Sequence, residues 1–246
     1  MPGFGKPGFG CGCQARLTGG MRAMNNGQLR VGGVVLCGGE SRRMGRPKAW
    51  LRLGDEYLLQ RVVRIVATVV SPVVVASRRR LELPPLPGAV SVAFDADELV
   101  GPLAGIVAGL DSLAGRCDAA FVAACDHALL TPAFVARMIE LLADHDAVVP
   151  ECGGQLFPTV AVYRLRTRPL LAQLLAAGEL RAKEFALRCG ARRATPADFA
   201  DVDPNLDALR NINTPEDYRE ARRTTTAGPG RPISCDDVMD SSGPEA

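Results

Sequence analysis

The sequence predicts an α/β fold built on a mostly parallel sheet, and three observations support this. Short apolar segments typical of buried strands alternate with longer segments whose apolar residues have helical spacing. The order strand, helix, strand repeats along the chain, which is typical of parallel strands joined by right-handed crossovers. The length of 246 residues also fits a single α/β unit with one core.

Five segments predict strands because they are short and largely apolar. They cover residues 31–37, 73–76, 90–94, 119–124 and 147–150. The segments between them predict helices over residues 56–70, 101–113 and 131–144. The last of these begins with Thr131-Pro132, a cap residue followed by proline at the first helical position.

The pattern is looser after Pro150. Residues 151–157 contain a Gly-Gly turn and predict a hairpin, and residues 159–163 alternate like a strand. Two helices are predicted over residues 169–177 and 182–188. A further helix is expected to begin at Thr214-Pro215, because a cap residue and proline are followed there by two acids.

The two ends of the chain have a different composition. Residues 1–30 are rich in glycine and proline and predict a disordered leader, and residues 222–246 predict a disordered tail. Residues 31–221 are predicted to form one domain. We hypothesise that translation starts at Met21 or Met24. An intact mass of the natural protein that begins at Met1 or Pro2 would exclude this hypothesis.

Overall charge and cysteine spacing argue against several classes of protein. The net charge is only +2, so no global field attracts nucleic acid or membrane, and neither is expected as a partner. No apolar run approaches the about 18 residues of a membrane span. The eight cysteines include no Cys-x-x-Cys pair, so zinc spacing is not met. A reducing, cytoplasmic compartment is the simplest interpretation.

A glycine-rich basic loop directly follows the first predicted strand. Gly38 and Gly39 end the apolar run, and basic residues surround Gly45 at Arg42, Arg43, Arg46 and Lys48. Glycine lets main-chain N–H groups approach a ligand, and basic side chains beside such groups form an anion site. The spacing matches neither a P-loop nor a dinucleotide fingerprint. The loop therefore predicts a phosphate site, with a plain basic surface loop as the alternative.

Other polar residues follow the predicted strands at the same edge of the sheet. Asp95 follows one strand, Asp126 follows another, and residues 211–213 precede the last predicted helix. Open α/β sheets bind ligands at the carboxyl ends of their strands. A single Asp at such a place is usually a turn or cap residue. Two of them opposite a phosphate loop predict a Mg²⁺ site, because carboxylate and phosphate oxygens hold this ion.

The scarcity of histidine limits the possible chemistry. His145 is predicted at the surface, and His127 beside Asp126 either contacts the site or is a loop histidine without a role. Nucleotidyl transfer needs positioning, a metal and cations rather than a histidine base. A phosphate monoester nucleophile has a second pKa of about 6 and is already anionic at neutral pH. The sequence is compatible with this reaction class.

The pattern Leu-x-Gly-Gly-x-Ser-x-Arg-Met-Gly-x-x-Lys at residues 36–48 resembles the signature loop of the molybdenum cofactor guanylyltransferases. Residues 101–105, Cys125-Asp126 and residues 211–216 resemble further blocks of that family, so the similarity covers roughly residues 31–221. The resemblance implies a Rossmann-like three-layer α/β/α sandwich of the nucleotide-diphospho-sugar transferase type. It also implies transfer of GMP from Mg-GTP to the terminal phosphate of molybdenum-molybdopterin, with release of pyrophosphate.

The resemblance assigns one group of residues to the nucleotide. Leu36, Cys37 and Gly38 are implied to lie against the guanine base and ribose, and Gly39 belongs to the same group. Asp95 matches the family's nucleotide-binding aspartate before the Gly-Pro-Leu-Ala-Gly block.

A second group is assigned to phosphate, metal and pterin. Lys48 and Arg43 are implied to neutralise the triphosphate, and Asp126 to bind Mg²⁺, which makes these three the expected catalytic residues. Asn213, together with Asn211, is implied to complete the metal and pterin side. The expected partners are GTP and molybdenum-molybdopterin, with transient contact to molybdenum insertion proteins or acceptor molybdoenzymes.

The chain departs from the family pattern at three places. After Asp126 the chain reads His127-Ala128-Leu129, where the family usually has a proline. Ser77 stands in the segment where the family has an asparagine after the second strand. Phe157-Pro158 stands where many relatives have His-Pro. The alternatives are a cytidylyltransferase, a sugar-phosphate nucleotidyltransferase, or a non-catalytic nucleotide-binding partner in cofactor assembly. Gly38 and the Gly-Pro-Leu-Ala-Gly block favour guanine, because the cytidylyltransferases usually have alanine at the first position and lack the second block.

Overall fold

The computed structural model describes residues 29–38, 47–94 and 101–227. Within these residues a central sheet of eight strands has the order β10-β7-β9-β6-β1-β4-β5, with β8 paired to β7. The strands are β1 Val31–Cys37, β4 Val73–Ser77, β5 Ser91–Phe94, β6 Ala119–Ala124, β7 Ala147–Cys152, β8 Gln155–Leu156, β9 Val160–Arg164 and β10 Arg192–Ala194. The four strands β6, β1, β4 and β5 are parallel, whereas β9 is antiparallel to both of its neighbours.

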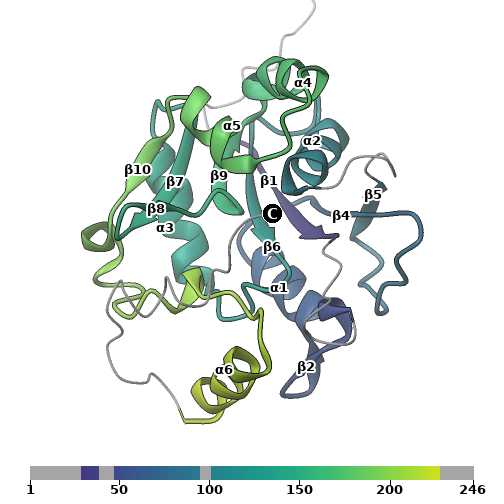
Figure 1. Cartoon of the computed structure of the whole chain (residues 1–246), viewed down its shortest axis with the longest axis vertical. Helices are drawn as coiled ribbons and strands as arrows, with labels where there is room; N and C mark the ends of the chain where they lie inside the picture. Colours follow the sequence, from purple (N-terminus) through teal and green to yellow (C-terminus); the bar gives the residue numbers. More distant parts are fainter. Residues whose placement is uncertain (1–28, 39–46, 95–100, 228–246) are drawn as a thin grey trace, which may run out of the picture.

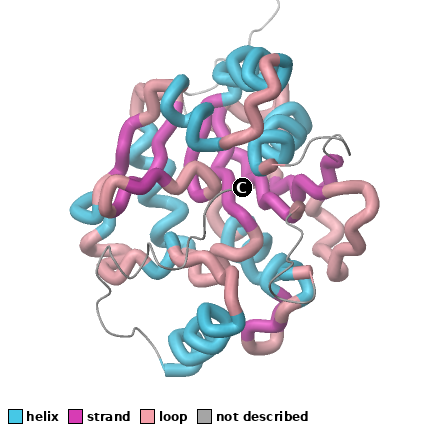
Figure 2. The backbone as a smooth tube through the Cα atoms, viewed as in Figure 1, coloured by secondary structure: helices cyan, strands magenta, loops and turns pink. Residues whose placement is uncertain are grey.

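Helices cover both faces of this sheet. They are α1 Leu58–Ala67, α2 Pro102–Ser112, α3 Pro132–Leu142, α4 Arg168–Ala176, α5 Ala182–Arg188 and α6 Pro215–Ala227. One hydrophobic core joins α1 and α3 to the first face, and a second core joins α2, α4 and α5 to the other. Figure 2 shows the strands running through the middle with helices around them. The predicted three-layer α/β/α sandwich is therefore confirmed.

Most predicted elements are present within a few residues of their expected bounds. Among the helices, the predicted and observed starts differ most for α1, which was expected to begin at residue 56. Residues 56–57 instead form β3 (Glu56–Tyr57), which pairs with β2 (Arg52–Leu53). Gly54 makes the turn between them with φ of 66°, a conformation that favours glycine. Helix α1 therefore begins at Leu58, where Oε1 of Gln60 accepts a hydrogen bond from the Tyr57 N–H at 3.2 Å.

The expectation of disorder from residue 222 is wrong up to Ala227, because α6 continues that far. Ala221 is buried, and the Arg222 guanidinium lies over the Tyr218 ring at 6.0 Å. The Tyr218 hydroxyl also donates to the carbonyl oxygen of Arg52. Figure 1 shows α6 beside β2 at the lower end of the molecule. These contacts continue the helix past residue 221, where composition alone predicted disorder.

The cysteine prediction holds only in part. Cys37, Cys117, Cys125 and Cys189 are free thiols, whereas Cys152 is disulfide-bonded. The reducing, cytoplasmic compartment therefore stays a prediction. Among the described residues, no helix is long and apolar enough to cross a membrane.

Glycines bring α2 unusually close to the sheet. A Cβ added at Gly109 would lie 2.3 Å from Cγ1 of Val34, and one added at Gly105 would lie 3.2 Å from Cδ2 of Leu36. Gly101 precedes the helix with φ of 156°, and a Cβ there would meet the Leu180 carbonyl oxygen at 2.8 Å. The Gly-Pro-Leu-Ala-Gly block thus has a packing role, because it seats the start of α2 near the carboxyl end of β1.

We expect Gly109→Val to destabilise the fold, because its side chain would overlap Val34. Overpacking of this kind costs about 3 kcal/mol of unfolding free energy, measured by urea denaturation. Gly88→Val is the control, since a Cβ at Gly88 has no atom within 4 Å. It should change stability by no more than about 0.5 kcal/mol. Equal losses in the two variants would contradict the close packing of α2 on β1.

Candidate functional site

The candidate site lies at the carboxyl edge of the parallel strands. Cys37 pairs in register with Ser77, and Ser77 with Phe94, so β1, β4 and β5 end side by side. The chain leaves β1 toward β4 and β5 and then returns to the other side of β1 as β6. This is a topological switch point, where open α/β sheets leave a crevice for a ligand. The Cys125 N–H donates to the Leu36 carbonyl oxygen at 2.9 Å, which links the residue after β6 to β1 at this edge.

Lys48 connects the glycine-loop segment to the other side of the crevice. It begins a 3-10 turn over Lys48–Trp50 that is anchored by the buried Ala49 and by a Trp50 Nε1–H bond to the Glu82 carbonyl oxygen. The Lys48 ammonium donates to Oδ2 of Asp126 at 2.8 Å and also to Oδ1 of Asn213. These partners are 78 and 165 residues away in sequence. Three expected site residues therefore meet at one point.

Asp126 is the acid of this junction. Burial disfavours its charged form, but the positive charge and hydrogen bond of Lys48 outweigh this, so the pKa of Asp126 lies below its ordinary value. The carboxylate is therefore ionised at neutral pH. Its second oxygen, Oδ1, is buried and has no hydrogen-bond partner. A buried anionic oxygen without a partner is costly unless a cation or donor meets it.

A helix start holds Asn213 beside Asp126. Oδ2 of Asp217 accepts hydrogen bonds from the N–H groups of Asn213 at 2.8 Å and Thr214 at 2.7 Å. The Thr214 hydroxyl accepts from the Asp217 N–H at 3.1 Å, which completes a capping box at α6. The Ile212 N–H donates to the Asp126 carbonyl oxygen at 3.1 Å. Asn213 is thus positioned by the cap of α6 and by a direct backbone link to the turn of Asp126.

The oxygen atoms of this site fit a magnesium ion shared with a substrate. Oδ1 of Asp126 and Oδ1 of Asn211 are both buried without a hydrogen-bond partner. Carboxylate and amide oxygens are ligands that Mg²⁺ accepts, and the ion usually keeps several waters and binds substrate phosphates. No cluster of three or more His, Cys, Asp or Glu that could hold a metal occurs in the described residues. These two oxygens therefore fit an ion whose other ligands would come from substrate and water.

His127 has a different position from either alternative considered above. Its side chain is fully buried, with Nδ1 3.1 Å from the Ala208 carbonyl oxygen and Nε2 3.4 Å from the Thr159 hydroxyl. Burial lowers the pKa of His127 and keeps the ring neutral at neutral pH. The alternative in which His127 contacts a ligand is wrong, because both ring nitrogens have protein partners. The other alternative, a loop histidine without a role, is wrong as well, because the ring of His127 joins three segments of the chain.

The remaining expected contacts are only partly described. Arg43, Gly39 and Asp95 lie outside the described residues, so their roles stay predictions. Leu36 and Cys37 have side chains buried in the two cores, and Gly38 is half-buried. If Leu36 and Cys37 contact a nucleotide, the contact must involve mainly their backbone.

Two buried polar residues were not singled out from the sequence as functional. Ser77 is fully buried, and its hydroxyl has no hydrogen-bond partner. Asp203 is also buried, and its two oxygens accept from the N–H groups of Asp207 at 3.0 Å and Ala208 at 2.9 Å. The signal for Ser77 was a polar residue ending an apolar strand. For Asp203 the only signal was an Asp-Pro pair in a loop, which does not predict burial.

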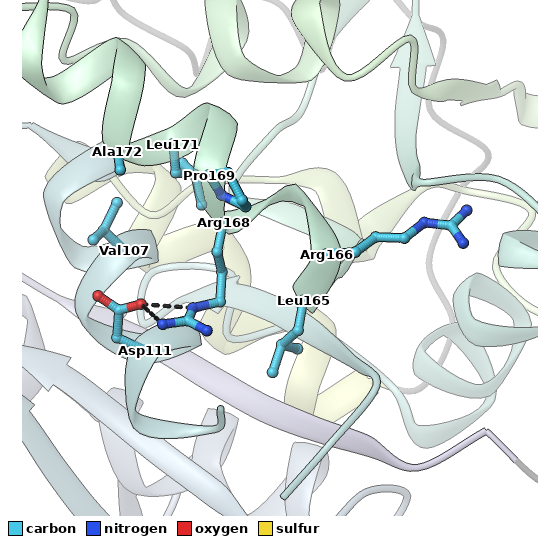
Figure 3. A pocket seen from close by; sticks show the side chains of 8 residues that line it. All are labelled: Val107, Asp111, Leu165, Arg166, Arg168, Pro169, Leu171 and Ala172. Atoms are coloured by element: carbon cyan, nitrogen blue, oxygen red, sulfur yellow. Dashed lines mark hydrogen bonds and ion pairs between the residues drawn. The ribbon is translucent and has the colours of Figure 1, made fainter. Parts of the chain in front are cut away.

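A separate pocket lies at the opposite edge of the sheet. Arg168 forms an ion pair with Asp111 of α2 at 2.6 Å, and Arg166 also lines this pocket. Figure 3 shows Arg168 turned toward Asp111, with Arg166 pointing away. Arg164 at the end of β9 pairs with Ala119 at the start of β6, which places this pocket far from the carboxyl edge. The carboxyl edge is the better candidate, because Asp126 is ionised there and its Oδ1 has no hydrogen-bond partner.

Comparison with known proteins assigns the class. Residues 33–190, more than half of the chain, match the family described as MobA-like NTP transferase domain. The structure of 2-C-methyl-D-erythritol 4-phosphate cytidylyltransferase from Thermus thermophilus has a similar fold, with a TM-score of 0.61 and 18% identity over 81% of this chain and all of that chain (100%). The family match therefore assigns the protein to the nucleotidyltransferases.

More similar relatives narrow the family. The molybdenum cofactor guanylyltransferase of Desulfosudis oleivorans is 34% identical over 200 residues, which cover 80% of this chain and 97% of the relative. That of Rhodobacter capsulatus is 34% identical over 197 residues, or 78% and 95% of the two chains. Molybdopterin-guanine dinucleotide biosynthesis protein A from Archaeoglobus fulgidus shares the fold, with a TM-score of 0.66 and 23% identity over 79% and 98% of the two chains. The chain belongs to the molybdenum cofactor guanylyltransferase family, which confirms the resemblance.

Asp203 should make stability depend on pH. Burial raises the pKa of Asp203 to about 6, so the folded protein binds this proton more tightly than the unfolded chain, whose Asp pKa is about 3.9. The stabilisation that protonated Asp203 gives to the folded protein is fully present below about pH 4. It is lost as the pH rises through about 6. The loss caused by Asp203→Asn in urea unfolding should therefore be about 2 kcal/mol larger at pH 4.5 than at pH 7.

Asp201→Asn is the control for this measurement. A hydrogen bond from Arg137 lowers the pKa of Asp201, so its contribution is lost as the pH falls. The two variants should therefore respond to pH in opposite directions. If the loss caused by Asp203→Asn were the same at both pH values, the raised pKa would be excluded.

Proposed function

We propose that the protein transfers GMP from Mg-GTP to the terminal phosphate of molybdenum-molybdopterin and releases pyrophosphate. The observation that carries this proposal is the junction of Lys48, Asp126 and Asn213 at the switch point of the sheet. It brings a cation, an ionised carboxylate and an amide oxygen together where such sheets bind nucleotides. The names of relatives with 34% identity support guanine as the base.

Each residue of the junction has a part in this reaction. The Lys48 ammonium is a mobile point charge that can pair with triphosphate oxygens and offset the charge that develops during transfer. Asp126, with Asn213 and Asn211, would hold the metal ion. Mg²⁺ supplies positive charge at phosphate oxygens during phosphoryl and nucleotidyl transfer. The protein thus contributes positioning and electrostatic stabilisation.

The positions of the histidines support a phosphate nucleophile. His127 is buried with both ring nitrogens bonded, and His145 is exposed after α3, away from the carboxyl edge. Neither can act as a general base in the crevice. A phosphate monoester needs none, because it is anionic at neutral pH. The cytoplasmic compartment and transient contact with insertion proteins or acceptor molybdoenzymes belong to this proposal through the family resemblance.

The nucleotide preference can be tested directly. Purified protein is incubated with molybdenum-molybdopterin, Mg²⁺ and each nucleoside triphosphate in turn, and the dinucleotide products are identified by mass spectrometry. GTP should give the guanine dinucleotide with one pyrophosphate per transfer. A preference for CTP would support the cytidylyltransferase alternative. No transfer with any nucleotide, despite nucleotide binding, would support the non-catalytic alternative.

Substitutions test the site assignment. Lys48→Met should lower kcat/KM for GTP by about 10²–10³-fold, because a group that stabilises transition-state charge is lost. Asp126→Ala should abolish Mg²⁺-dependent turnover while the protein remains folded. Lys183→Met and Asp144→Ala are the controls, because both residues are exposed and lie outside the crevice. Full activity in either site variant would refute the assignment.

A further inference from the structure

The buried imidazole of His127 joins three segments that are distant in sequence. It follows Asp126 in the turn after β6, its Nδ1 lies 3.1 Å from the Ala208 carbonyl oxygen, and its Nε2 lies 3.4 Å from the Thr159 hydroxyl. Ala208 belongs to a short 3-10 turn at Asp207–Leu209, and Thr159 precedes β9. The side chain is fully buried, so it acts within the protein and not on a substrate.

The direction of these hydrogen bonds follows from their partners. The Ala208 carbonyl oxygen can only accept, so Nδ1 must carry the proton and donate. In the neutral ring Nε2 is then the acceptor for the Thr159 hydroxyl. The Ala208 N–H is itself held by Oδ2 of Asp203 at 2.9 Å. Both backbone groups of Ala208 are therefore hydrogen-bonded, the N–H to Asp203 and the carbonyl oxygen to His127.

The bond between His127 and Ala208 links the turn of Asp126 to the segment that carries Asn211 and Asn213. Asp126 immediately precedes His127, and its carbonyl oxygen accepts from the Ile212 N–H at 3.1 Å. Ile212 lies between Asn211 and Asn213, in the segment that begins at Ala208. The His127 bond and the Ile212 bond thus tie the turn of Asp126 to the asparagine segment at two points. The turn has Ala128 and no proline, so hydrogen bonds rather than a ring restrict it.

A further contact holds the other side of the same turn. Nε of Arg61 on α1 donates to the Ala128 carbonyl oxygen at 2.7 Å. Restraints therefore come from α1, from residue 159 and from residues 208–212, in addition to the bonds of Lys48 to Asp126 and Asn213. Of these, the His127–Ala208 bond connects the turn of Asp126 through a side chain to the segment that carries the asparagines.

We propose that His127 is a positioning residue of the metal site, whose Nδ1–H bond to Ala208 fixes the Asp126 carboxylate relative to Asn211 and Asn213. This inference rests on the proposed role of Asp126 in holding Mg²⁺. Partners that orient a metal ligand without touching the metal are worth about 10–100-fold in metal affinity. His127 acts through Asp126 in this way, so its loss weakens metal binding more than it weakens nucleotide binding.

Two substitutions separate the positioning role from simple filling of space. The amide N–H of His127→Asn lies close to the place of Nδ1 and keeps the bond to Ala208. The longer His127→Gln places its amide near Nε2, where it reaches Thr159 but loses Ala208. Mn²⁺ binding is measured by the electron paramagnetic resonance of free Mn²⁺, with a non-hydrolysable GTP analogue at saturation. Urea unfolding and the Mg²⁺ activation constant are measured in parallel.

The expected result is a Mn²⁺ dissociation constant within about 3-fold of wild type for His127→Asn and raised about 10-fold for His127→Gln. The affinity for the nucleotide should change by less than about 3-fold in both variants. Thr159→Val should have a small effect, because its bond is long at 3.4 Å. Equal Mn²⁺ affinity in the Asn and Gln variants, with only stability reduced, would overturn the inference and leave His127 as a core residue.

Asp126→Ala is measured in the same assay to separate this inference from the proposed function. If Asp126→Ala loses Mn²⁺ while His127→Gln binds it normally, the positioning role is refuted and the metal assignment stands. If Asp126→Ala binds Mn²⁺ as tightly as wild type, the metal assignment is refuted, and the role of His127 with it. A loss in Asp126→Ala and His127→Gln, with recovery in His127→Asn, supports both.

Discussion

The ammonium group that Asp126 and Asn213 share is the interaction on which the site depends. Lys48 comes from the loop after β1, Asp126 from the end of β6 and Asn213 from the start of α6. The Lys48 charge keeps Asp126 ionised despite burial, since it lowers the pKa of that carboxyl. An ionised, partly unpaired carboxylate is what a divalent cation requires. One contact thus assembles the site and sets its charge.

The sheet and α2 supply the rigidity that this contact needs. The carboxyl ends of β1, β4 and β6 are aligned by parallel pairing, and glycines let α2 pack directly on β1. Rigid elements hold functional groups more accurately than loops do. Asp126 and Asn213 lie on short turns, and these turns are restrained by the cap of α6, the Ile212 backbone bond and the buried His127.

Much of this arrangement could be predicted because it depends on local pattern. Continuous apolar runs indicated the buried strands, and Thr214-Pro215 indicated the start of α6. The carboxyl-edge rule also grouped Lys48, Asp126 and Asn213, although their contacts join residues far apart in sequence. Local pattern cannot show which polar side chains become buried, so the bonds of His127 and Asp203 were not foreseen. The extension of α6 to Ala227 depends on contacts of Tyr218 and Ala221 and not on composition.

The most direct test of the central claim is a crystal structure with Mn²⁺ and a non-hydrolysable GTP analogue, in which anomalous scattering locates the metal. The account predicts an anomalous peak within coordination distance of Oδ1 of Asp126, with triphosphate oxygens around it and Lys48 Nζ in contact with them. A metal and triphosphate bound elsewhere, such as the pocket between Asp111 and Arg168, would contradict it.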